Sequence, residues 1–263
     1  MTAIVPSYVA KANRAEKHLI DLEAEIERYA ARKPYTVRTV EGKKQRKVRR
    51  LVFTADPANT DIPIIVADVV YNLRSALDHL MGAMHPRSRR THVMFPIFFK
   101  GIWKAGPEGE NLERTEQRMR WNTSVRGLPD EAIAYLKRLQ PPDSTGDDRQ
   151  FNRLVVINRL SNRDRHEKLP VVAAALRSVA VTVTMPDGDR KLGAATPRLD
   201  FFENKAEITG VPYPALDVEI DGAPVIVIRT SQKDANIEIP AELSESLKMV
   251  RAITERLVPY VRG

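Results

Sequence analysis

The chain has 263 residues, enough to bury a sizeable core in one large domain or in two small ones. Its hydrophobic content of 43% and its charged content of 29% are ordinary for a soluble globular protein. It contains no cysteine, which excludes a disulfide framework and a zinc–thiolate site.

Two further features bear on location and partners. No window approaches the roughly 18–20 uninterrupted apolar residues that a membrane span needs, and the first residues lack the charged and apolar regions of a signal peptide. We therefore expect a soluble, cytoplasmic protein with no membrane partner. The net charge of +8 and the pI near 9.7 favour polyanionic partners, nucleic acid first.

The first predicted elements are a helix and a hairpin. Residues 7–31 predict an amphipathic helix, because apolar residues recur there at spacings of four and three. Residues 35–40 and 48–54 predict two strands joined by a tight turn. The segment KKQRKVRR, at the tip and on the return arm, is the densest positive run in the chain. It is either a solvated surface or a grip on phosphates through Lys43, Lys44 and Arg46.

Residues 61–84 predict the long helix around which the other elements are organised. Pro63 suits the first turn, where its missing N–H is not needed, and Asp61 can cap the free amides. At 100° per residue a broad apolar stripe forms along one side. Its members are Val66, Val69, Leu73, Ala76, Leu77 and Leu80.

The opposite side of this helix carries polar groups. Asp68, Asn72, Ser75 and His79 align along it, and Arg74 and Asp78 are one turn apart, close enough to pair. One interpretation is a solvated face with a satisfied histidine. The other is a functional face, because this mixture contains neither the lysine nor the glutamate that dominates ordinary surfaces.

Residues 85–109 are rich in proline, glycine and arginine and predict an irregular loop. The apolar patch at residues 94–99 should pin this loop, which then serves as a wall of a nearby site. His85 and His92 are further site candidates that no pattern positions. Shorter helices are predicted at residues 111–121 and 129–139.

A further helix begins near residue 149, and its inward side changes from apolar to polar along its length. Asn158, Asn162 and Arg165 follow the apolar residues on the same face, with Asp164 and His166 at the edges. If this helix packs beside the long one, the two polar patches meet. The alternative is a frayed, solvated helix end.

The last third predicts strands at residues 179–185, 198–203, 216–220 and 223–228, the last two joined as a hairpin by an Asp-Gly turn. A final helix begins at Pro240, with an apolar side at Leu243, Leu247, Val250, Ile253 and Leu257. No catalytic constellation appears in this part. We expect a small antiparallel sheet with a helix.

Known catalytic motifs are largely absent. The chain has no glycine-rich phosphate loop, no dinucleotide-binding turn, no HExxH and no nucleophile elbow. Asp78, His79, Asp164 and His166 could supply ligands for a hydrolytic metal. However, adjacent residues on a helix diverge by about 100°, which hinders Asp78 and His79 from binding one ion.

Acid–base chemistry on a phosphodiester needs fewer assumptions than metal-dependent hydrolysis. A histidine can take a proton from a ribose 2′-hydroxyl or give one to the leaving oxygen. An arginine can hold the phosphate and stabilise the charge that develops on it. RNA supplies its own nucleophile, so no cofactor is required.

The segment RSALDH, from Arg74 to His79, resembles the Arg-x4-His signature of the HEPN superfamily. Those proteins are helical bundles, many of them metal-independent ribonucleases of toxin–antitoxin and antiviral systems, and some relatives bind nucleotides or RNA without cutting. They usually act as dimers with the arginine and histidine of both subunits at the interface. The segments YNLRSALDHL and NRDRHEKL are also similar to a group of uncharacterised bacterial proteins. Ser75 stands where the active nucleases commonly carry Asn, Asp or His.

The resemblance covers residues 7–175 and implies an α+β, mainly α fold. We expect a HEPN-like helical domain at 1–176 with a basic hairpin at 35–54, then a small β-rich region with a terminal helix at 177–263. The expected function is metal-independent RNA cleavage by a homodimer, with RNA and an antitoxin or other protein as partners. The alternatives are a non-catalytic RNA-, nucleotide- or protein-binding module and a metal-dependent hydrolase.

In the nuclease hypothesis each polar residue has a role. His79 is the general acid and base, Arg74 is the phosphate clamp, and Asn72, Ser75 and Asp78 orient them. The far wall of the site consists of Asn158, Asn162, Arg163, Arg165 and His166.

Overall fold

The computed structural model shows a mainly helical chain with antiparallel sheets. Its six described α-helices all overlap helices predicted from periodicity. They are α1 (Ser7–Ala31), α2 (Asp61–Ala83), α3 (Leu112–Val125), α4 (Asp130–Arg138), α5 (Arg153–Asp164) and α6 (Ala241–Leu257), with 3-10 turns η1 (Arg87–His92) and η3 (Val258–Tyr260). The structure describes residues 5–33, 35–41, 48–55, 61–98, 112–140, 153–164, 169, 171–174, 179–184, 188–195, 198–200, 205–212, 217–221, 225–228 and 237–262.

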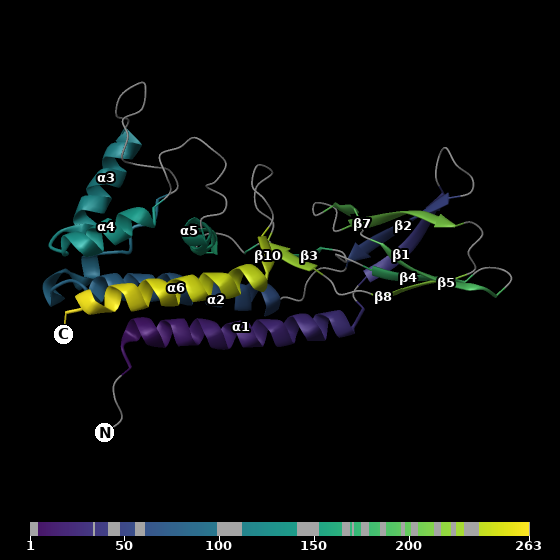
Figure 1. Cartoon of the computed structure of the whole chain (residues 1–263), viewed down its shortest axis with the longest axis horizontal. Helices are drawn as coiled ribbons and strands as arrows, with labels where there is room; N and C mark the ends of the chain where they lie inside the picture. The colour runs from purple at the N-terminus through teal and green to yellow at the C-terminus, as the bar shows by residue number, and fades with distance from the viewer. Residues whose placement is uncertain are drawn as a thin grey trace. The chain divides into compact units, whose positions relative to one another are not determined.

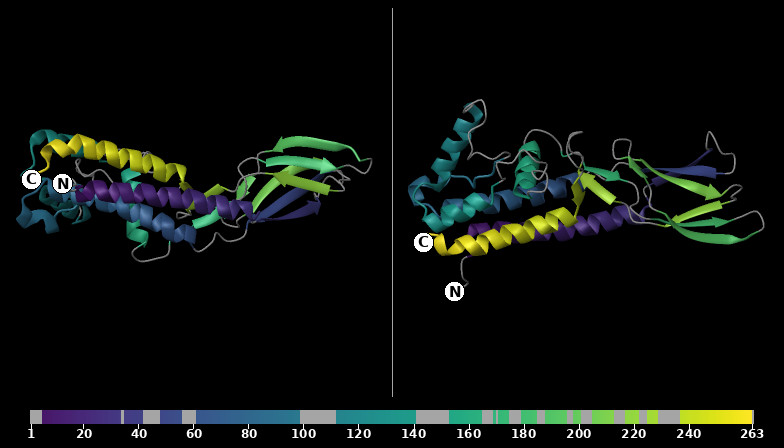
Figure 2. Two further views of the ribbon diagram at one scale, coloured as in Figure 1. Left: turned by 90° about the horizontal axis from the view of Figure 1, so that it is seen from below. Right: turned by 45° about the horizontal axis from the view of Figure 1, so that its top comes forward.

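Helices α1, α2 and α6 lie side by side (Figures 1 and 2). The Lys11 ammonium of α1 lies 5.0 Å from the centre of the Tyr71 ring of α2, a cation–π contact. Arg251 of α6 donates to both carboxylate oxygens of Glu16 of α1, at 2.9 and 2.8 Å. These polar contacts flank an apolar seam between the helices.

The apolar stripes predicted for these helices are confirmed as core. On α2, every member of the predicted stripe is completely buried, as are Val70 and Met81 beside it. The predicted stripe of α6 is also buried. Burial of such side chains is the main favourable contribution to folding, about 1.5–3 kcal/mol for each large aliphatic group. Of the helices in the described part, none combines the length and apolar composition of a bilayer-spanning segment.

Ten described strands form three antiparallel sheets (Figure 1). The predicted hairpin is confirmed as β1 (Tyr35–Glu41) and β2 (Val48–Ala55), which belong to a sheet of order β1-β2-β7-β6. A second sheet has the order β10-β9-β3 and a third β5-β4-β8. The other strands are β3 (Val171–Ala174), β4 (Val179–Thr184), β5 (Arg190–Ala195), β6 (Arg198–Asp200), β7 (Lys205–Pro212), β8 (Asp217–Asp221), β9 (Val225–Ile228) and β10 (Ile237–Ile239).

The predicted hairpin of residues 216–220 and 223–228 is wrong. Both strands exist, as β8 and β9, but β8 pairs with β4, whereas β9 pairs with β3 and β10. The Asp-Gly turn signal describes only local backbone preference, whereas β8 pairs with the earlier strand β4, and β9 pairs with the earlier strand β3 and with β10, which follows it. Strands β3, β5, β7 and β10 were not predicted.

The chain forms two compact units that interleave along the sequence. The helical unit is Met1–Ile20, Ile65–Leu169 and Glu242–Gly263, and the β-rich unit is Asp21–Ile64 and Pro170–Ala241. This division differs from the predicted boundary at 176/177. The hairpin joins the β-rich unit because β2 pairs with β7, and the last helix joins the helical unit because α6 packs on α1.

Candidate functional site

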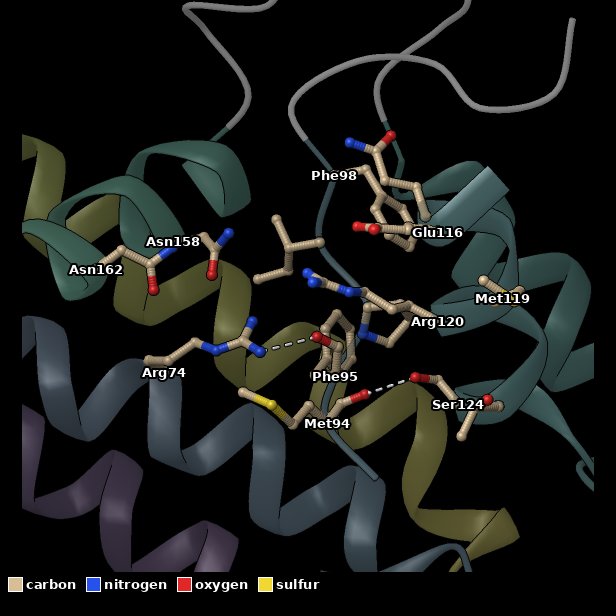
Figure 3. Close-up of a pocket in the computed structure, with 14 residues that line it drawn as sticks. Arg74, Met94, Phe95, Phe98, Glu116, Met119, Arg120, Ser124, Asn158 and Asn162 are labelled. Atoms are coloured by element: carbon tan, nitrogen blue, oxygen red, sulfur yellow. Dashed lines mark hydrogen bonds between the residues drawn. The ribbon is translucent and has the colours of Figure 1, made fainter. Parts of the chain in front are cut away.

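The candidate site is built around an extended segment, residues 93–98, which we call the strap. The strap leaves η1 and passes between α2 and α3 (Figure 3). Val93, Phe95 and Phe98 are buried, whereas Met94 is 51% exposed. An extended segment outside a sheet has backbone N–H and C=O groups that need partners when they are buried. Side chains from α2, from α3 and from Gln140, just after α4, supply them.

A clamp on α2 holds the centre of the strap. Arg74 pairs with Asp78 one turn along the helix, N to O 2.9 Å, which confirms the predicted pair. Arg74 Nη2 also donates to the Phe95 carbonyl oxygen at 2.9 Å, and the Phe95 N–H donates to Asp78 Oδ1 at 2.9 Å. The ion pair thus satisfies both backbone groups of one residue, as a neighbouring β-strand would.

Two further helices bind the ends of the strap. The Ser124 hydroxyl of α3 donates to the Met94 carbonyl at 3.0 Å (Figure 3). The buried Gln140 side chain, just after α4, donates to the Pro96 carbonyl at 2.9 Å and accepts from the Phe98 N–H at 3.3 Å. Polar side chains as well as buried apolar ones therefore hold the strap in place.

His85 and the arginines that follow it stabilise helix ends. His85 is 1% exposed, and its Nε2 donates to the Ser124 carbonyl at 2.8 Å. Arg89 donates to carbonyls of Thr123 and Arg126, at the end of α3, and Arg262 donates to the Gly127 carbonyl. Cations at a helix C-terminus satisfy free carbonyls and complement its dipole.

Burial lowers the pKa of His85 below its usual value, because the imidazolium would lose its hydration. The hydrogen bond to Ser124 opposes this shift, and the charges of Arg89 and Arg262 lower the pKa further. Because a carbonyl can only accept, Nε2 carries the proton of the neutral ring. His85 is therefore a neutral structural residue at neutral pH.

The strap forms the floor of a pocket of about 960 Å³ in the helical unit (Figure 3). Arg74 lies at one side of it, Asn158 and Asn162 of α5 lie beside Arg74, and α3 forms the opposite side. Of the two alternatives for the polar end of α5, these two asparagines follow the one in which it lies beside α2. The lining residues are Arg74, Met94, Phe95, Pro96, Ile97, Phe98, Glu116, Gln117, Met119, Arg120, Thr123, Ser124, Asn158 and Asn162.

Six of the eight polar residues that line the pocket, all but Gln117 and Thr123, differ in whether they have partners. Arg74 and Ser124 are engaged in holding the strap. Four others make no hydrogen bond or ion pair with any described residue: Glu116, Arg120, Asn158 and Asn162. Half-buried or exposed polar groups that converge on an apolar floor are available to a ligand, and their arrangement is typical of small-molecule sites.

The other predicted catalytic residues do not line this pocket. His79 is exposed, and Ser75 is half-buried on α2. Asn72 is buried, and its amide donates to the Asp68 carbonyl at 2.8 Å within the same helix. The expected polar face of α2 is therefore divided between water, the helix backbone and the strap.

The remaining predicted site residues are distributed as follows. Arg163 is half-buried and Asp164 is exposed, both at the end of α5 and neither lining the pocket. Among the described residues no three His, Asp or Glu side chains gather as metal ligands would. The predicted residues Arg165, His166, Lys43, Lys44 and Arg46 lie outside the described residues.

Sequence analysis missed the α3 side of the site and the residues that hold the strap. Glu116 and Arg120 are one turn apart in a strongly polar helix, so their pattern resembled an ordinary exposed face. One local signal placed Gln140 at a helix end: it directly precedes Pro141 and Pro142, and helices usually end at or before a residue that precedes proline. Nothing in the sequence indicated which carbonyls it would meet.

Comparisons of the chain with protein families, with curated proteins and with solved structures find no match.

Replacing Asp78 by alanine should lower the free energy of unfolding by about 3 kcal/mol, because it leaves the Arg74 charge buried without its counter-ion. The carboxylate is 21% exposed, so the loss should fall at the lower end for buried pairs. The double variant Arg74→Met with Asp78→Leu should lose less than Asp78→Ala alone. Urea denaturation measures both, with Asp68→Ala, exposed on α2, as the control. Equal losses for Asp78→Ala and Asp68→Ala would contradict the clamp.

His85 should make folding stability depend on pH. Its pKa is lower in the folded chain than the usual value of about 6.5, so the unfolded chain binds the proton more readily. Its contribution is complete above about pH 6.5 and decreases as the pH falls toward the folded-state pKa, by at most about 1.4 kcal/mol per pH unit. Urea titrations between about pH 5 and 7 should show this slope, reduced in His85→Gln. Parallel profiles for both proteins would disprove it.

Proposed function

We propose that the chain binds a nucleotide or single-stranded RNA in the pocket formed by α2, α3, α5 and the strap. The observation that carries this proposal is the set of free polar groups, Arg120, Glu116, Asn158 and Asn162, around an apolar floor. Proteins recognise unpaired nucleotides by packing the base on apolar, aromatic or arginine side chains and by hydrogen-bonding its edges.

The charge of the chain supports the same class of ligand. A net charge of +8 attracts a polyanion, and Arg120 supplies an exposed cation at the pocket itself. The resemblance to HEPN proteins points to RNA or nucleotides as well. The pocket volume of about 960 Å³ is large enough for one nucleotide unit.

Binding without cleavage fits the geometry of the single chain better than catalysis does. Arg74 is engaged with Asp78 and with the Phe95 carbonyl, so its role in this chain is to position the strap. The predicted proton carrier, His79, does not line the pocket that Arg74 lines. A general acid or base must reach the reacting oxygen within hydrogen-bond distance.

Fluorescence anisotropy with short single-stranded RNAs of mixed sequence tests the binding proposal. We expect binding that weakens steeply between about 50 and 200 mM salt, because bound phosphates release counter-ions. Arg120→Ala should weaken it about tenfold, which corresponds to roughly 1.4 kcal/mol. Arg126→Ala is the matched control, since Arg126 is exposed, carries the same charge and does not line the pocket. Equal effects of the two variants would refute a role for the pocket.

A second candidate function is metal-independent RNA cleavage by a homodimer. The observation that favours it is the exposure of His79, five residues after Arg74 on α2, which leaves its imidazole accessible to a second chain. In this proposal His79 of one subunit completes the pocket of the other. Acid–base transfer by the histidine would then act on the 2′-hydroxyl and the leaving oxygen.

Incubation of mixed RNAs with the protein in EDTA tests this second candidate. We expect cleavage by the wild type and a loss of at least about a hundredfold in rate for His79→Ala, in line with the contribution of a general acid or base. His18→Ala, which changes a histidine on α1 outside the pocket, should cleave as the wild type does. If the wild type binds the RNA but does not cleave it, the cleavage proposal is wrong and the binding proposal stands.

A further inference from the structure

The pocket has no surplus of positive charge. The Arg74 charge is neutralised by Asp78, and the two free charges at the pocket, Arg120 and Glu116, have opposite signs and lie one turn apart on α3. A phosphate group placed here would meet one free guanidinium and one carboxylate. Phosphate sites instead gather several cations or backbone N–H groups around the anion. The charge balance therefore favours a neutral group inside the pocket.

Two asparagines of the pocket supply uncharged hydrogen-bonding groups. Asn158 and Asn162 are one turn apart on α5, and Figure 3 shows both amides at the same side of the pocket. Each amide offers a donor and an acceptor in one plane. The edge of a nucleobase presents donors and acceptors in one plane too, which is why asparagine amides pair with base edges.

The apolar part of the pocket suits a flat ring. Phe95 and Ile97 of the strap line it, as do two methionines, Met94 of the strap and Met119 of α3. Both methionines are strongly exposed, 51% and 57%. Thioether side chains are flexible and polarisable, so they adapt to aromatic faces and bind them favourably.

We infer that the pocket takes one unstacked nucleobase, with its edge against Asn158 and Asn162. This inference rests on the proposed function and specifies which part of the ligand the pocket recognises. Arg120 extends from α3 into the pocket (Figure 3), where its guanidinium can meet the phosphate attached to the bound base. The base belongs either to a free nucleoside or nucleotide or to a single strand of RNA.

The decisive comparison is between a short RNA and an abasic ribose–phosphate chain of the same length. The wild type should bind the RNA at least tenfold more tightly than the abasic chain. Asn158→Ala and Asn162→Ala should each weaken RNA binding about tenfold and leave binding of the abasic chain unchanged. Asn122→Ala, an exposed asparagine of α3 outside the pocket, is the control and should change neither.

A second measurement reports position without relying on a variant. In protein labelled with carbon-13 at the methionine methyls, nucleosides that carry no phosphate should shift the Met94 and Met119 signals, and Met81, completely buried in α2, should not respond. If nucleosides shift these signals, the pocket binds free nucleosides as well as RNA. If only the RNA shifts them, the pocket binds a base only within an RNA strand.

The outcomes separate the two proposals. Equal affinity for RNA and for the abasic chain would overturn base recognition and leave RNA binding standing. The same would follow if the asparagine variants weakened binding of both ligands equally. No binding of RNA, abasic chain or nucleoside at low salt would overturn the proposed function and the inference together.

Discussion

The ion pair between Arg74 and Asp78 is the interaction on which the rest of the site depends. The guanidinium is almost completely buried, and removal of a charge from water is costly unless a counter-ion and hydrogen bonds compensate for it. Asp78 and the Phe95 carbonyl provide that compensation. In return the pair supplies both hydrogen bonds of Phe95, so an extended segment can lie buried outside any sheet.

The strap in turn defines the pocket. Ser124 and Gln140 hold it on either side of the clamp, and each uses a side chain from a different helical element. Three helices are thus tied to one extended segment by directional bonds, whereas the packing of α1, α2 and α6 relies on apolar seams. The pocket suits a ligand because hydrogen bonds fix the strap that lines it, while other polar groups of its lining have no partner among the described residues.

The need to satisfy backbone carbonyls also explains Arg89, which precedes the strap. Its guanidinium donates to carbonyls of Thr123 and Arg126 at the end of α3, close to where His85 donates to the Ser124 carbonyl. A positive charge used in this way stabilises the end of α3. The cation that remains free at the pocket, within the described residues, is Arg120. Charge at the site is therefore far more balanced than the net charge of +8 suggests.

The sequence by itself determined the helices, their buried stripes, the early hairpin and the pairing of Arg74 with Asp78, because period, caps and i,i+4 spacing are local properties. For Asn158 and Asn162 it left two alternatives open, a patch facing α2 and a solvated helix end. Only the tertiary structure decided that Arg74 binds the strap and His79 faces water, and that β8 and β9 take distant partners. Those outcomes depend on which buried backbone groups need partners, a requirement that arises only when segments far apart in the chain meet.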